Sequence, residues 1–437
     1  GPACDAPRGS PTLSAAPSEP TGTAPGPRRA TIAFIFVTVL IDVLAIGLII
    51  PVLPRLVQDF VGGDTAMAAA MFGLFGTSWA LMQFLFSPIL GALSDRFGRR
   101  PVILLSCLGL GLDYVFMAMA PSLGWLFVGR LFSGITAATF STALAYISDV
   151  TPPEKRAASF GIMGAAFGSG FVLGPAVGGL LGGLSPRAPF WVSAALALIN
   201  VVYGYFVLPE SLSREHRRAF DWKRANVIGT FTAFSKFPAI LAIAGAVFLW
   251  QLAHQVYPST WSFFAEINLG WSPGEIGLSL AFVGVCMIFT QGYLVGRVVP
   301  KVGEYRAAII GVMSGTVSML ILAFATTASW AYIAMAAGAV QGLAYPAMNA
   351  IVSKQAPPDQ QGELQGGISS MLSLTTIIGP LLLTQTLGYF SRADSPVYFP
   401  GAVFLLSGGL ALLALLIFLR VGARQPASAL PEAGGAG

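Results

Sequence analysis

Charged and chemically reactive side chains are scarce in this sequence. Only 10% of its 437 residues are charged, and it contains two histidines and three cysteines. The cysteines stand at positions 4, 107 and 286, a spacing that predicts neither a disulfide framework nor a metal site. No H-E-x-x-H, G-x-S-x-G or G-x-x-x-x-G-K-[ST] motif occurs. We therefore expect no enzymatic activity, no cofactor and no ATP hydrolysis by this chain.

Hydrophobic residues, in contrast, make up 55% of the chain, and its mean hydropathy is +0.74. A water-soluble core cannot bury that much apolar surface, so we expect lipid to be the solvent for much of the chain. The formal net charge of +5 does not indicate nucleic-acid binding, because the basic residues lie in short loops between apolar runs. The composition predicts a multi-pass membrane protein.

Apolar runs of roughly 20 residues, the length that spans a bilayer, recur twelve times. They lie near 31–57, 66–93, 101–120, 123–149, 157–183, 189–208, 238–265, 274–298, 305–327, 330–354, 362–390 and 396–420. We predict an all-α membrane protein with twelve transmembrane helices in two six-helix, pseudo-symmetric halves, 29–208 and 237–421. The longest polar gap, 209–236, is predicted to be a cytoplasmic linker, and the ends 1–28 and 422–437 are predicted to be disordered tails.

Basic residues are distributed unequally between the two sides of these runs. If both termini are cytoplasmic, the opposite side carries only Arg55, Arg187 and Arg392. Under the positive-inside rule, this asymmetry predicts that both termini are cytoplasmic.

Loop and glycine positions recur at a fixed offset of 205 residues. The matching pairs include Gly91 and Gly296, Gly98 and Gly303, Pro152 and Pro357, Pro153 and Pro358, Gly174 and Gly379, and Pro175 and Pro380. Two parallel structural repeats explain these matches, and transporters built in this way bind substrate between the halves, near the bilayer midplane.

A short polar stretch, 91–100, separates the second and third apolar runs and reads G-A-L-S-D-R-F-G-R-R. Its charges cannot lie in hydrocarbon, so it must be a turn at one membrane face. We expect Asp95 to cap the next helix, and Arg99 and Arg100 to bind lipid phosphates. The residues of this stretch that we predict to gate the cytoplasmic side are Gly91, Asp95, Arg96, Gly98, Arg99 and Arg100.

Three charged residues, Asp42, Asp113 and Arg130, lie deep inside apolar runs of the first half. At the 205-residue offset their counterparts are Val247, Ser318 and Met335, so the fold itself does not require charge there. Each charge costs about 2.5–3.5 kcal/mol on insertion scales, and an intramembrane ionisable residue is a functional candidate by default. An apolar environment favours the neutral form of a carboxyl, and a nearby arginine favours its charged form, so the chemistry on offer is proton exchange. A purely structural charge cluster, in which Arg130 neutralises Asp42 or Asp113, is the alternative.

The fifth apolar run carries a series of glycines and one proline: Gly161, Gly170, Gly174, Pro175, Gly178 and Gly179. Small residues at this spacing allow close helix packing, and proline bends a helix. We predict that Gly174 and Pro175 take part in gating, and an ordinary packing seam is the alternative.

Several of these stretches resemble motifs of the major facilitator superfamily. The 91–100 stretch resembles the loop between its helices 2 and 3, the glycine series resembles its antiporter signature, and G-R-L-F-S-G at 129–134 resembles its helix-4 motif associated with proton coupling. The segments 41–54, 111–114, 251–261, 361–366 and 378–382 look like the bacterial tetracycline efflux proteins, which are drug/proton antiporters. The resemblance covers nearly the whole membrane region. It implies that Asp42, Asp113, Arg130, Asp95 and Gln291 serve drug–proton exchange.

Two positions depart from that branch. Its helix-8 histidine falls on Met287, and its helix-9 aspartate falls on Gly315. Proton coupling would then rest on the first half or be achieved differently, and a magnesium–tetracycline chelate would lose one anionic partner. Tetracycline as the substrate is therefore left open.

Polar and aromatic residues inside the runs are candidates for binding substrate. His254 shares one side of a helix with Gln251 and Gln255, and histidine titrates near neutrality, although a hydrogen-bonded interior histidine is the commoner case. For the others, hydrogen bonding between helices is the alternative. The predicted substrate-binding residues are Gln83, Tyr114, Gln251, His254, Gln255, Trp261, Gln291, Asn349 and Gln365.

These observations favour a secondary active transporter of the bacterial inner membrane. It would export a small amphiphilic drug, tetracycline or another, in exchange for protons by alternating access. A facilitator or symporter of a small metabolite with the same fold is the alternative. We expect the lipid bilayer, protons and the small molecule as its partners, no nucleic acid, no metal, and a functional monomer.

Overall fold

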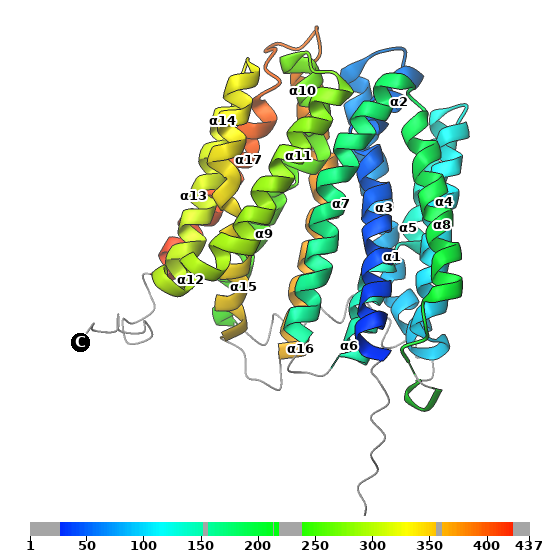
Figure 1. Ribbon diagram of the computed structural model, residues 1–437. Helices are drawn as coiled ribbons and strands as arrows, with labels where there is room; N and C mark the ends of the chain where they lie inside the picture. The colour runs from blue at the N-terminus through cyan, green and yellow to red at the C-terminus, as the bar shows by residue number, and fades with distance from the viewer. Residues whose placement is uncertain (1–26, 152–155, 213, 218–237, 355–360, 423–437) are drawn as a thin grey trace, which may run out of the picture.

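The computed structural model describes the whole chain except residues 1–26, 152–155, 213, 218–237, 355–360 and 423–437. All regular elements in the described ranges are helices. Most of these helices run side by side along one common direction (Figure 1). The predicted tails, most of the predicted linker and the predicted proline pairs at 152–153 and 357–358 lie outside the described residues.

The first half of the fold is built from the helices that precede the linker. They are α1 (Pro27–Ile49), α2 (Leu53–Phe60), α3 (Thr65–Phe97), α4 (Arg99–Met119), α5 (Leu123–Thr136), α6 (Thr139–Val150), α7 (Arg156–Leu184) and α8 (Ala188–Val207). A short 3-10 turn, η2 (Arg214–His216), follows. Within this half α1 packs on α7 and α8, and α4 packs on α5 and α8.

The second half follows the linker. Its elements are α9 (Pro238–His254), α10 (Val256–Leu269), α11 (Pro273–Phe289), η4 (Thr290–Leu294), α12 (Val295–Val302), α13 (Glu304–Ala323), α14 (Ala328–Gly338), η5 (Ala339–Leu343), α15 (Ala344–Lys354), α16 (Gln361–Phe390) and α17 (Ala402–Gly422). Here α17 packs on α9 and α13, and α13 packs on α14 and α15.

The helices account for the twelve predicted crossings. Ten described segments are long and apolar enough to cross a membrane. The other two crossings are the interrupted pairs α9–α10, which breaks at Gln255, and α14–α15, which η5 separates. The sequence did not predict these breaks, nor the π-helical segment η4, nor the break between α5 and α6. The prediction of twelve crossings is nevertheless confirmed, because each break lies within a predicted apolar run.

The two repeats have the same turn at the same place. Gly98 ends α3 with φ +111°, and its counterpart Gly303 ends α12 with φ +80°. Backbone with positive φ strains any residue that carries a Cβ, so glycine is required at both turns. A tight turn therefore reverses the chain between crossings two and three, and again between crossings eight and nine.

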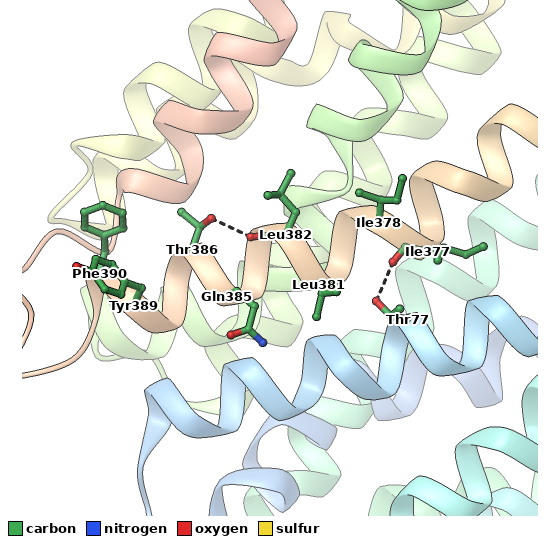
Figure 2. A pocket seen from close by; sticks show the side chains of 9 residues that line it. All are labelled: Thr77, Ile377, Ile378, Leu381, Leu382, Gln385, Thr386, Tyr389 and Phe390. Carbon is green, nitrogen blue, oxygen red and sulfur yellow. Dashed lines mark hydrogen bonds between the residues drawn. The ribbon is translucent and has the colours of Figure 1, made fainter.

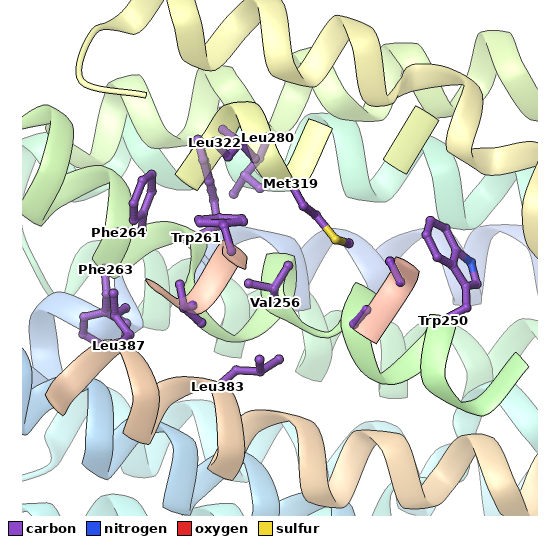
Figure 3. Close-up of a cluster of buried hydrophobic side chains, with 14 of the residues drawn as sticks. Trp250, Val256, Trp261, Phe263, Phe264, Leu280, Met319, Leu322, Leu383 and Leu387 are labelled. Atoms are coloured by element: carbon purple, nitrogen blue, oxygen red, sulfur yellow. The ribbon is translucent and has the colours of Figure 1, made fainter. Parts of the chain in front are cut away.

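The halves contact each other chiefly through α3 against α16 and α7 against α11. On the first seam, Thr77 Oγ1 donates to the Ile377 carbonyl at 2.8 Å, and Gln385 Nε2 donates to the Ala70 carbonyl at 3.4 Å. The apolar core continues from there into the second half. Figure 3 shows its aromatic part, with Trp261 and Phe264 beside Leu280 and Leu322.

We call the end with the α3–α4 turn the charged end, and the end at which α2 and α10 lie the closed end. At the closed end Ser262 Oγ of α10 donates to the Ile50 carbonyl at 3.5 Å, and Glu266 of α10 interacts electrostatically with Arg55 and Gln58 of α2. A Cβ on Gly179 would collide with the Pro273 carbonyl and lie 3.1 Å from the Gly274 Cα. These contacts seal the closed end.

The halves separate toward the charged end. Along α7 and α11, Gly168 is the glycine nearest the charged end that approaches the other half, where Ile288 Cγ1 lies 3.4 Å from its Cβ position. Closer to the charged end, Gly164 and Gly292 have no described atom within 4 Å of their Cβ positions. At these two glycines, unlike at Gly168, the halves do not contact each other in the described part of the chain.

Candidate functional site

A buried ion pair joins two of the predicted charges. Arg130 Nη2 of α5 donates to Asp113 Oδ2 of α4. The Asp113 side chain is 0% exposed and the Arg130 side chain 17%. Gly129 lies against the same carboxylate, since its Cβ position is 2.7 Å from Asp113 Oδ1. Arg130 thus pairs with Asp113 and not with Asp42, which decides between the two partners that the sequence left open.

This pair is incompletely satisfied. Asp113 Oδ1 and Arg130 Nε are buried without a hydrogen-bond partner among the described residues. Removing two charges from water costs several kcal/mol each, and the attraction between them repays this only when the remaining polar atoms are also bonded. The pair is therefore weak support for stability, which favours a role in transport over a purely structural one.

The third charge, Asp42 of α1, lies in a different polar cluster of the same half. The residue is 7% exposed, and its Oδ1 has no hydrogen-bond partner in the described chain. The Thr139 hydroxyl of α6 interacts with the carboxyl, and Cys107 and Tyr114 of α4 lie within its electrostatic reach. The groups described around this carboxyl are neutral, so no cation in the described part of the chain pairs with it.

Asn200 of α8 extends this cluster, and the sequence reasoning missed it. Its Nδ2 donates to the Thr38 carbonyl at 2.9 Å and lies 3.7 Å from Cys107 Sγ, while its Oδ1 is buried and unpartnered within the described part of the chain. Thr139 was missed as well; its Oγ1 lies 4.0 Å from Cys107 Sγ. A neutral polar residue inside an apolar run was the available signal, but many such residues merely bond a neighbouring helix.

At the charged end, ion pairs hold the 91–100 turn in place. Arg99 bonds Asp95 Oδ1 at 2.5 Å and, through Nε, Asp149 Oδ2 of α6 at 3.0 Å. Arg100 Nη2 donates to the Tyr205 carbonyl, and its guanidinium lies 5.4 Å from the centre of the Tyr205 ring. In the structure both arginines thus bond protein groups, where we expected lipid phosphates.

The prediction that Asp95 caps the next helix is wrong. Gly98 is the N-cap of α4, and the carboxylate that accepts from the first backbone N–H groups is that of Glu210: Arg99 N donates at 2.8 Å and Arg100 N at 3.3 Å. Asp95 lies inside α3, two residues before its last residue, Phe97, and bonds Arg99 instead. Glu210 follows α8 in the chain, and its role as the cap of α4 was not predicted because it is far from α4 in sequence.

The other predicted gating residues near the turn lie at its surface. Gly91 has no described atom within 4 Å of its Cβ position. Arg96 is exposed and lies over the Phe97 ring, 5.1 Å from its centre. Gly91 and Arg96 are thus exposed at the charged end, and the Phe97 ring is a neighbour of Arg96 there.

The glycine series of α7 packs in two directions. Toward α1, the Cβ position of Gly174 is 2.6 Å from the Gly47 Cα. A Cβ on Gly178 would collide with the Leu48 carbonyl. Toward the other half, the Pro175 carbonyl faces Gly277 of α11 so closely that no Cβ fits there. The series is a packing seam, and one side of that seam is an interface between the halves. The two interpretations of it are thus compatible.

The second half contains a polar and aromatic cluster at the α9–α10 break. The His254 ring lies 5.8 Å from the Trp250 ring and 5.1 Å from the Tyr257 ring, and the hydroxyls of Tyr257 and Ser318 are 3.4 Å apart. His254 Nδ1 and Gln341 Oε1 are buried without partners among the described residues.

This cluster explains the departure at Gly315. A Cβ on Gly315 would collide with the Trp250 ring and lie 2.9 Å from Gln341 Oε1. An aspartate cannot be placed there unless Trp250 moves, because the ring occupies the space.

The remaining predicted substrate-binding residues are not gathered in one place. Gln83 donates to the Ala137 carbonyl at 3.4 Å, and Trp261 is 3% exposed and donates to Ser279 Oγ at 3.0 Å. Gln255 packs against Gly379 at the helix break. Tyr114 is buried, and neither its hydroxyl nor the buried Oδ1 of Asn349 has a hydrogen-bond partner among the described residues. Gln251 is half-buried, Gln291 is exposed on η4, and the Gln365 side chain lies outside the described residues.

A shallow apolar groove lies on the outside of the α3–α16 seam. Figure 2 shows it running along α16 from Ile377 to Phe390, with Thr77 of α3 at one side. Its volume is about 640 Å³, and none of the predicted site residues lines it. In the described ranges, no group of three or more His, Cys, Asp or Glu side chains is placed to hold a metal ion.

Comparison with known proteins adds to this geometry. The family model of the Major Facilitator Superfamily matches residues 35–336 and 243–436. The chain is 42% identical to the class C tetracycline resistance protein of Escherichia coli over 347 residues, which are 79% of this chain and 87% of that protein. It is 36% identical to the class H tetracycline resistance protein of Pasteurella multocida, over 89% of this chain and 95% of that protein. The crystal structure of the human organic anion transporter MFSD10 superposes with a TM-score of 0.68 at 22% sequence identity, covering 90% of this chain and 100% of that one.

Proposed function

Because the chain belongs to the Major Facilitator Superfamily, we propose that it exports a small amphiphilic drug in exchange for protons. It is a multi-pass membrane transporter and not an enzyme. The observation that carries the proposal is the one-sided placement of buried charge: Asp42, Asp113 and Arg130 are all in the first half, and their counterparts in the second are Val247, Ser318 and Met335.

The proposed roles follow from the two carboxyls. Asp42 has no cation beside it, so it is the group that gains the incoming proton. Asp113 is held by Arg130, and a change in that pair's spacing would couple the proton to movement of α4 against α5. Both carboxyls lie in the membrane interior, where a proton or a cationic drug can compete for the same negative charge.

Transport would proceed by alternating access, in which the halves 29–208 and 237–421 rock against each other. We take the structure, in which the halves contact each other at the closed end but not at Gly164 and Gly292, to be one of the two access states. By the positive-inside rule, the charged end is the cytoplasmic one. We place both termini in the cytoplasm and the chain in a bacterial inner membrane, with the monomer as the functional unit.

Tetracycline is the first substrate to test, because the relatives named above are tetracycline resistance proteins. Met287 and the Trp250-filled space at Gly315 mean that the second half would have to bind it by neutral groups, among them His254, Gln341 and Asn349. A different amphiphilic drug is the alternative within the same mechanism.

The test is drug accumulation in bacterial cells that express the chain. We expect wild-type cells to accumulate less drug than cells carrying Asp42→Asn, and a protonophore to abolish the difference while cellular ATP is held constant. Export that continues without the proton gradient would refute the antiport proposal, and export by Asp42→Asn at the wild-type rate would refute the role of Asp42. Membrane insertion of the variant is checked by its level in isolated membranes.

A further inference from the structure

Two ion pairs at the charged end occupy equivalent places in the two repeats. In the first half, Arg99 Nε lies 3.0 Å from Asp149 Oδ2. In the second half, Lys354 Nζ lies 2.7 Å from Glu304 Oε1. At the 205-residue offset, Arg99 corresponds to Glu304 and Asp149 corresponds to Lys354.

The polarity of the pair is reversed between the repeats. In each half the first residue of the third crossing, α4 or α13, bonds the charged-end terminus of the fourth crossing, α6 or α15. A brace that only stiffened each half would work with either polarity. Reversal has one additional effect, which is to give equivalent helix ends in the two halves opposite charges.

Neither pair joins the halves in this structure. The helix α6 packs on α1, α4 and α7, and α15 packs on α9, α13 and α16. Figure 1 shows α6 and α15 at the same end of the molecule, on opposite sides of α7 and α16. The Lys354 side chain is 70% exposed, so it can turn toward a new partner, whereas the Asp149 side chain is 20% exposed.

The closed end shows how the halves meet when an end is sealed. There the end of the first crossing, at Ile50 and Arg55, contacts its equivalent in the seventh, at Ser262 and Glu266. At the closed end the first and seventh crossings, which are equivalent in the two repeats, therefore contact each other. At the charged end, the fourth and tenth crossings are the equivalent ends that carry opposite charges.

We propose that Asp149 and Lys354 form an ion pair between the halves when the charged end closes. Lys354 then leaves Glu304, and Asp149 exchanges or shares Arg99. With equal polarity in both repeats, like charges would face each other and oppose closure. The inference rests on the proposed alternating access, but not on the identity of the drug.

A packed glycine supplies the conformational control. Gly179→Trp places a large side chain where the Pro273 carbonyl and Gly274 now lie, so it prevents sealing of the closed end and shifts the protein toward the state in which the charged end is closed. Gly183→Trp is the matched control. Gly183 lies one helical turn after Gly179 in α7, and no described atom is within 4 Å of its Cβ position.

The experiment joins Asp149→Cys to Lys354→Cys with a short bismaleimide in purified protein, with the chain's own three cysteines as background. We expect strong cross-linking on the Gly179→Trp background, and weak cross-linking on the Gly183→Trp and unmodified backgrounds. Equal, low cross-linking on all three would overturn the proposal. The cross-linking experiment needs no drug. Strong cross-linking on the Gly179→Trp background, in a protein whose wild type exports no drug, would refute the proposed function and support this inference.

A second variant tests the charge itself. The double exchange Glu304→Lys/Lys354→Glu keeps the ion pair within the second half but places a glutamate opposite Asp149. We expect export to fall by about tenfold or more, and Asp149→Lys added to it to recover part of the loss. Wild-type export by the double exchange, with normal folding, would show that the two pairs are independent braces and overturn the proposal.

Discussion

Removing Arg130 alone should harm the protein more than neutralising both members of its ion pair. Arg130→Ala leaves Asp113 buried, at 0% side-chain exposure, with no cation beside it. Breaking a buried pair in this way costs about 3–5 kcal/mol, whereas replacing both charges with neutral groups of similar volume is often neutral or stabilising. For the double variant Asp113→Asn/Arg130→Gln we therefore expect a stability close to that of the wild type.

Two measurements on the same preparations separate stability from transport. Thermal unfolding in detergent, followed by size-exclusion of the surviving protein, should rank the wild type and the double variant together and Arg130→Ala well below them. Proton-coupled export from proteoliposomes should be lost in both variants. The double variant is the informative one, because it is folded and lacks only the charges.

Two results would refute this reasoning. If Arg130→Ala is as stable as the wild type, then Asp113 is not held as a carboxylate by Arg130. If the double variant exports at the wild-type rate, the pair is a structural charge cluster, and proton coupling must be assigned to Asp42 alone.

Two further predictions follow from contacts elsewhere. Glu210→Ala removes the acceptor for the backbone N–H groups of Arg99 and Arg100, so we expect a loss of about 1–3 kcal/mol, which a lower unfolding temperature would reveal and which an unchanged temperature would contradict. Gly315→Asp should lower the yield of folded protein, because the carboxylate meets the Trp250 ring, and Trp250→Val added to it should restore the yield; a stable Gly315→Asp single variant would disprove this account.

The sequence predicted the architecture well, because a helix that crosses a bilayer must be long and apolar, and a charged residue inside it costs free energy. Gly98 and Gly303 lie at the turns that the repeat indicated, and helix ends mostly lie within a few residues of the predicted runs. The breaks at Gln255 and at η5 were missed, although a proline follows each of them, Pro258 in α10 and Pro346 in α15. A proline removes one helical hydrogen bond and clashes with the preceding turn, so these two residues were the available signal.

Part of the site could likewise be predicted from the sequence and part could not. Asp42, Asp113 and Arg130 could be found from sequence because charge in hydrocarbon is rare. Their partners could not: Arg130 could equally have reached either carboxyl, and Glu210 lies 111 residues along the chain from Arg99, the first residue of the helix that it caps. Contacts between crossings depend on packing geometry, which sequence periodicity does not contain.

The central claim is that proton movement through the first half drives drug export, and one measurement tests it most directly. Proteoliposomes loaded at acidic pH are given tetracycline, with and without magnesium, beside cationic and neutral amphiphilic drugs, and internal pH is recorded with a trapped dye. We predict drug-dependent proton release by the wild type and none by Asp42→Asn. Equal proton release by both proteins, or drug uptake with no proton movement in either, would contradict the claim.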